Sequence, residues 1–137
     1  MKLKKNVGTA VICGDKILLG KRIETYKGLP VNFGGYWSIF AGSVEDEEAP
    51  YFAAVRELKE ETQLQPKNPI RYFRSFLDGE CEFLFYVSHV EKLFTPQLSF
   101  EHTDSKWFEI ESLRDFPYKI DKKILDCILD YHHQLIN

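Results

Sequence analysis

Negative charge is crowded into one stretch of the sequence, GSVEDEEAPYFAAVRELKEETQL, residues 42–64. The first twenty of these positions hold seven of the 21 acidic residues of the 137-residue chain. Pro50 suits the first turn of a helix, and residues 51–62 contain no further Pro or Gly. The stretch therefore predicts an acidic loop followed by a helix.

Three carboxylates share one face of this predicted helix. Glu57, Glu60 and Glu61 stand at i, i+3 and i+4, within about 100° of arc. The other side carries the apolar residues Tyr51, Phe52, Ala54, Val55 and Leu58. Like charges at this spacing cost only about 0.2–0.5 kcal/mol per pair, so a solvated acidic face is affordable. Hard divalent cations also take carboxylate oxygens, and geometry alone leaves both interpretations open.

The spacing of the whole stretch resembles the Nudix box, G-x5-E-x7-R-E-U-x-E-E-x-G-U, in which U is apolar. Gly42, Glu48 and the run 56–62 occupy the defined positions, and Leu64 ends the box. Gln63 is the one departure, because the family usually has glycine there. Glycine permits a left-handed turn at low cost, whereas Gln in that conformation costs about 1 kcal/mol, unless the turn takes another shape.

The resemblance implies an enzyme, a Nudix pyrophosphohydrolase. Such enzymes cleave a phosphoanhydride bond in a nucleoside diphosphate linked to another group, using water and Mg²⁺, with Mn²⁺ as an alternative. Glu57, Glu60 and Glu61 are then the metal ligands, and Arg56 pairs with Glu48 to hold the helix to its loop. A cation so placed would neutralise phosphate charge and lower the pKa of a bound water.

A general base is also expected, and some family members carry it outside the box. Glu101, in FEHTDSKWF, fits that place best, with Glu80 and Glu82 as less favoured rivals. Other members use a box glutamate as the base, so a surface role for Glu101 stays open. His102 follows Glu101 directly and is expected to pack or to lie at the surface rather than to act in catalysis.

Substrate contacts are less well marked. Arg22 resembles a residue that contacts substrate phosphate in the family, and Gly42 is expected at the substrate site as the first residue of the box. Tyr36 and Trp37 could stack on a base or close the core. They belong to an aromatic cluster that also includes Tyr26 and Phe33.

The rest of the chain predicts one α+β domain over residues 1–137. Its opening is a hairpin turning at residues 14–15, followed by a long loop over residues 23–36. Asp121 is the expected N-cap of a final helix. Strands are expected at residues 7–13, 16–22, 37–40, 70–76, 81–90 and 106–110. The resemblance implies the Nudix fold, a mixed β-sheet sandwiched between helices.

The composition indicates which partners the protein can bind and in which compartment it is expected. A net charge of -3 argues against broad nucleic-acid binding, although capped RNA stays open because a local basic groove is not excluded. Three widely spaced cysteines predict free thiols in a reducing compartment, and no apolar run suits a signal peptide or a membrane span. A cytoplasmic protein without membrane contact is expected.

The preferred substrate is a small nucleotide, either a nucleoside triphosphate or a nucleotide sugar. Within the enzyme class, dinucleoside polyphosphates and capped RNA are alternatives. From another class, a non-catalytic Nudix-fold module that senses a nucleotide remains, as does an acidic interaction domain. A homodimer, as formed by many family members, is also compatible with the sequence.

Overall fold

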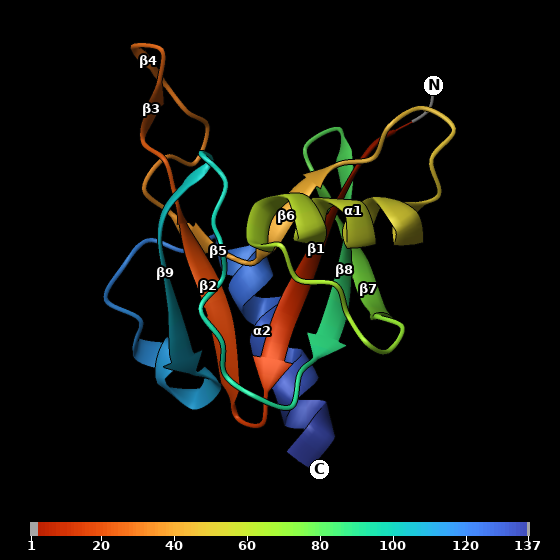
Figure 1. Cartoon of the computed structure of the whole chain (residues 1–137), viewed down its shortest axis with the longest axis vertical. Helices are drawn as coiled ribbons and strands as arrows, with labels where there is room; N and C mark the ends of the chain where they lie inside the picture. Colours follow the sequence, from red (N-terminus) through yellow and green to blue (C-terminus); the bar gives the residue numbers. More distant parts are fainter. Residues whose placement is uncertain (1–2, 137) are drawn as a thin grey trace.

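A computed structural model describes residues 3–136. Its centre is a mixed sheet in the order β5-β2-β1-β8-β7, to which β6 is joined through β1 and β9 through β2 (Figure 1). β1 pairs in parallel with β8 and antiparallel with β2 and β6. The strands of this sheet are β1 (Lys4–Cys13), β2 (Lys16–Arg22), β5 (Trp37–Ser38), β6 (Phe40–Ser43), β7 (Arg71–Asp78), β8 (Cys81–His89) and β9 (His102–Glu109).

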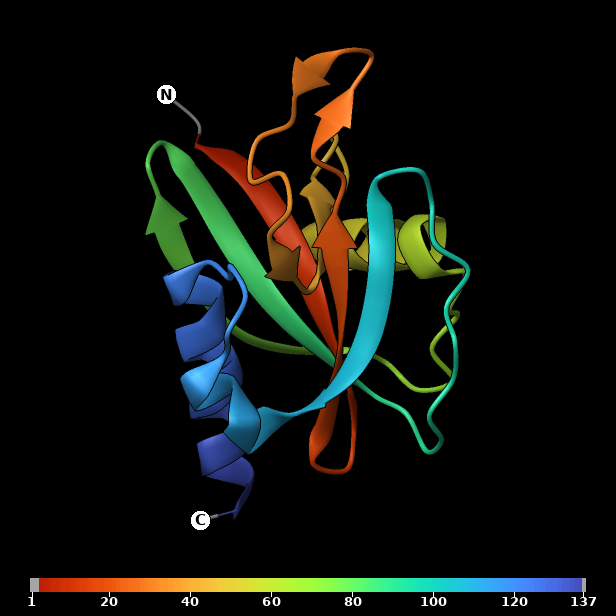
Figure 2. The ribbon, with the colours of Figure 1, turned by 90° about the vertical axis from the view of Figure 1, so that its left-hand side faces the viewer.

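The two α-helices cover opposite faces of the sheet (Figure 2). They are α1 (Pro50–Thr62) and α2 (Lys122–Ile136), and a 3₁₀ helix, η1 (Ile110–Asp115), follows β9. β1 is buried on both sides because its side chains alternate between the layers. Val7 packs with Ala53 and Ala54 of α1, whereas Ala10 belongs to the core beneath α2. The predicted α+β fold is confirmed.

The predicted turns and caps of these elements are present. Gly14 takes a positive φ of 62° between β1 and β2, where Cys13 pairs with Lys16. Asp121 caps α2, because its Oδ1 accepts a 2.8 Å hydrogen bond from the Lys123 backbone N–H. Among residues 3–136, no helix combines the length and apolar character needed to cross a membrane.

Residues 23–36 differ from the predicted loop. They contain a small hairpin of β3 (Thr25–Tyr26) and β4 (Leu29–Pro30), which projects from the end of the sheet (Figure 1). Positive φ values at Lys27 and Gly28 make its tight turn. The Tyr26 ring lies 5.1 Å from that of Phe100, so the hairpin contacts the segment that leads into β9.

Candidate active site

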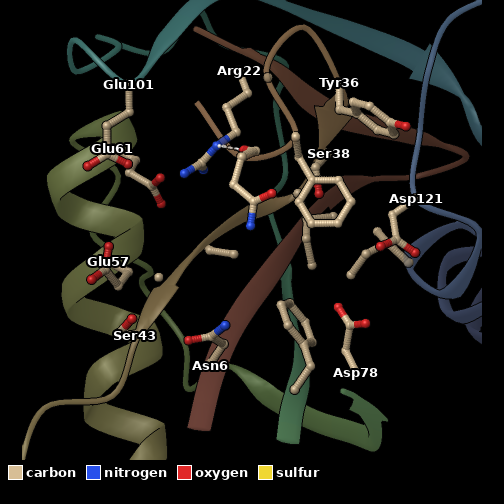
Figure 3. Close-up of a pocket in the computed structure, with 18 of the residues that line it drawn as sticks. Asn6, Arg22, Tyr36, Ser38, Ser43, Glu57, Glu61, Asp78, Glu101 and Asp121 are labelled. Atoms are coloured by element: carbon tan, nitrogen blue, oxygen red, sulfur yellow. Dashed lines mark hydrogen bonds between the residues drawn. The ribbon is translucent and has the colours of Figure 1, made fainter. Parts of the chain in front are cut away.

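A cavity of about 640 Å³ opens beside α1, within the size range of small-molecule sites. Figure 3 shows its charged walls. Glu57, Glu61 and Glu101 lie at one side, and Asp78 and Asp121 lie at the other. The Arg22 side chain and the aromatic rings of Phe33, Tyr36, Phe76 and Phe83 line the space as well.

Two of the three clustered glutamates of α1 line the cavity. Glu57 and Glu61 are one turn apart and face it, and Gly42 of β6 makes room for the first of them. A Cβ atom at residue 42 would collide with the Glu57 carboxylate. Glu60 does not line the cavity, because its side chain is 56% exposed and lies 3.3 Å from Nη1 of Arg56.

Glu61 is the most unusual acid of the site. The residue is 1% exposed, and neither of its carboxylate oxygens has a hydrogen-bond partner within the described protein. Burial, together with the nearby negative charges of Glu101 and Glu57, raises the pKa of Glu61 to about 10. A divalent cation would stabilise the ionised Glu61 carboxylate, because it supplies both the missing partner and the missing positive charge.

The residues present fit a cation by charge and burial rather than by preformed geometry. Within residues 3–136, no three His, Cys, Asp or Glu side chains already have the arrangement of a metal centre. Burial raises the pKa of Glu57 above its usual range, although its bond to Arg56 opposes the shift. Oxygen donors held in a partly desolvated pocket are the set that hard cations prefer.

Arg56 joins the acidic loop to α1. Its Nε and Nη2 donate to the two carboxylate oxygens of Glu48 at 2.8 and 2.9 Å, and its Nη1 donates to Glu57 at 2.9 Å. Nη2 also reaches the carbonyl oxygen of Ser43 at 3.0 Å. The Arg56 hydrogen bond lowers the pKa of Glu48 to about 2. This bidentate pair fixes the loop and braces Glu57 at the cavity wall.

Of the other site residues predicted from the sequence, some line the cavity and others do not. Glu101 is brought to the cavity, whereas Glu82 bonds to Ser75 and, like Glu80, is absent from its lining. Arg22 lines the cavity, and its Nε donates to the carbonyl oxygen of Asn32 at 2.9 Å.

The aromatic lining residues Tyr36 and Trp37 differ in burial. Tyr36 is half-buried, but Trp37 is 3% exposed and packs edge-on against Phe108 in the core.

Several lining residues have little or no signal in the sequence. Asn6 and Asp78 belong to no recognisable motif, and the sequence marks Asp121 only as a helix cap. His102 lines the cavity and is 8% exposed, with its Nδ1 lacking a hydrogen-bond partner within the described protein. Its position directly after Glu101 was the one available indication.

Known proteins are similar to this chain over most of its length. Residues 2–127 match the NUDIX domain family. A MutT protein from Methanosarcina mazei Go1 is 19% identical with a TM-score of 0.76, over 98% of this chain and 96% of that one. The NUDIX domain of Shewanella oneidensis NrtR, solved with ADP ribose, is 18% identical with a TM-score of 0.77, over 98% and 90%. A C. elegans Ap4A hydrolase is 20% identical with a TM-score of 0.72, over 96% and 98%.

A curated relative is matched over a shorter region. It is an octanoyltransferase from Myxococcus xanthus, 32% identical over 94 residues. The match covers 63% of this chain and 26% of that protein, about a quarter of the relative's length. At these identities, the likeness to the solved structures establishes the fold.

Proposed function

Because this chain belongs to the Nudix hydrolase family, whose enzymes are pyrophosphohydrolases, we propose that it cleaves a phosphoanhydride bond with the help of Mg²⁺. The substrate is a nucleoside diphosphate linked to another group, either a nucleoside triphosphate or a nucleotide sugar. The observation that carries this proposal is the Glu61 carboxylate, buried and unpartnered beside Glu57 and Glu101. A solvated acidic face would not bury such a group.

Each part of the site has a role in this proposal. Glu57 and Glu61 hold the cation, and Glu60 joins them by turning inward from Arg56. When bound, the cation neutralises phosphate charge, polarises phosphorus and lowers the pKa of a bound water. Mn²⁺ would serve in its place, because it prefers the same oxygen donors.

The remaining residues bind substrate and move the proton. Glu101 accepts the proton of the attacking water, and its place beside Glu61 at the cavity wall supports that role. Arg22 binds a phosphate oxygen, and Tyr36 offers a ring on which a base stacks. Gly42 has no side chain, and this leaves space in the cavity wall for the Glu57 carboxylate next to the pyrophosphate.

The test is a substrate panel measured with and without Mg²⁺. It contains nucleoside triphosphates, nucleotide sugars, dinucleoside polyphosphates and capped RNA, with products separated by chromatography. Metal-dependent cleavage of one class is expected to disappear in Glu61→Gln and to persist in the matched control Glu82→Gln, whose side chain is outside the cavity. If no member of the panel is cleaved but nucleotides still bind, the result would instead favour a sensing module.

We also propose that residues 1–137 act as one domain in the cytoplasm. The three cysteines are free thiols, which suits a reducing compartment. Light scattering after gel filtration measures whether two copies associate into a homodimer. Imaging of a tagged copy tests the compartment, and a signal confined to another organelle would contradict it.

A further inference from the structure

Unpaired polar atoms gather at one point of the cavity wall. Among residues 3–136, four buried side-chain atoms have no hydrogen-bond partner within the protein: Thr9 Oγ1, both carboxylate oxygens of Glu61, and His102 Nδ1. Three of the four lie together, because Nδ1 of His102 is 4.0 Å from Oε1 of the Glu61 carboxylate. Buried polar atoms are nearly always paired, so three such atoms together indicate a functional arrangement.

An irregularity in the sheet turns His102 toward Glu61. Lys21 pairs with Asp104, but Arg22 pairs with His102, so Thr103 is an extra residue in β9. In regular pairing Thr103 would oppose Arg22, and His102 would lie on the other face of the sheet. In the structure Thr103 is exposed, whereas His102 is buried and lines the cavity.

The His102 ring is held in place from behind. A Cβ atom at Gly20 would lie 2.8 Å from Cδ2 of the ring, so only glycine leaves the ring its space. The Phe40 ring packs against it, with centroids 5.1 Å apart and an interplanar angle of 65°. With that side blocked, the ring has little freedom to turn away from the carboxylate.

We propose that His102 is a positioning residue whose Nδ1–H donates to Glu61 Oε1 and orients this carboxylate toward the cation. A movement of about 1 Å brings the present 4.0 Å separation into the range of an N–H···O bond. The inference rests on the proposed function, in which Glu61 is a metal ligand. Partners that orient a ligand in this way contribute roughly 10–100-fold to metal affinity.

Two variants of similar size separate orientation from packing. His102→Asn carries an amide N–H as many bonds from the backbone as Nδ1, whereas His102→Leu fills the same space without a donor. Mn²⁺ affinity of the nucleotide-free protein, measured by electron paramagnetic resonance, is expected to fall roughly 10–100-fold in the Leu variant. The Asn variant should stay near the unaltered protein, and Thr103→Val is the matched surface control.

Equal Mn²⁺ affinities for the Asn and Leu variants would overturn the inference, because a packing role treats the two alike. If the Leu variant does not fold in a thermal melt, His102→Gln replaces it, since its amide reaches the Nε2 position instead. The inference then requires weak binding by Gln and near-normal binding by Asn. A wild-type protein that binds no Mn²⁺ would overturn the proposed function as well, so the two failures are distinguishable.

Discussion

Replacing Gln63 by glycine is expected to stabilise the protein without altering the catalytic site. Gln63 ends α1 in the left-handed conformation, with φ 66° and ψ 9°. Its backbone N–H donates to the carbonyl oxygen of Lys59 at 2.8 Å, a contact that needs no side chain. The side chain is exposed and lies outside the cavity lining. Only the Cβ atom opposes this conformation, and glycine removes it.

The size of the effect follows from two opposing terms. The left-handed conformation costs a residue with a Cβ about 1–2 kcal/mol, whereas glycine loses about 0.5–1 kcal/mol more backbone entropy on folding. A net gain of about 0.5–1 kcal/mol in the free energy of unfolding is expected. With an unfolding entropy of about 2.1 cal/mol/K per residue over 137 residues, Tm should rise by roughly 2–3 °C.

Thermal and urea unfolding followed by circular dichroism measure this gain. The m-value should stay unchanged, because the surface exposed on unfolding is the same. Gln63→Ala is the matched control, since it shortens the side chain but keeps the Cβ atom, and it should not raise Tm. A Gln63→Gly protein no more stable than the unaltered one, or an Ala variant that gains as much, would refute the reasoning.

Three further predictions concern the site and its support. Gly42→Ala should lower kcat on the order of 100-fold by displacing Glu57, while Tm changes little because only a flexible side-chain end must move; unchanged kcat would contradict this. The pKa of Glu48 falls from 4.5 to about 2 on folding, so its bond with Arg56 stabilises the protein above pH 4.5. This stabilisation is lost as the pH falls toward 2. Urea midpoints across that range should fall less steeply for Glu48→Gln, and parallel curves would exclude the effect. Glu101→Gln should lower kcat by about 100- to 10,000-fold while Mn²⁺ still binds, and full activity would assign the base elsewhere.

Local chemistry explains why several elements could be predicted from the sequence. Pro50 and the absence of later breakers predicted a helix over residues 51–62, and α1 is Pro50–Thr62. Asp121 has a side chain suited to capping, and it caps α2. Such features depend on neighbours within one turn, which the sequence displays directly. The box resemblance added the family, which the match over residues 2–127 confirms.

Features that depend on segments far apart in the chain could not be predicted from the sequence. Helical spacing put three glutamates on one face, but Glu60 lies about 60° from Glu57 in the direction away from Glu61. Arg56, itself bound to Glu48, holds it outside the cavity. His102 was expected to pack or to lie at the surface. Its inward direction depends on the extra residue in β9, which strand alternation cannot reveal.

The parallel pairing of β1 with β8 has a consequence for folding during synthesis. Each paired residue of β1 meets a partner 77 positions later, as Lys4 meets Cys81. Closing a loop of that length costs about 4 kcal/mol of chain entropy before any contact compensates for it. A ribosome must therefore release β8 before the edge of β1 is covered, and until then an apolar strand is exposed to other nascent chains.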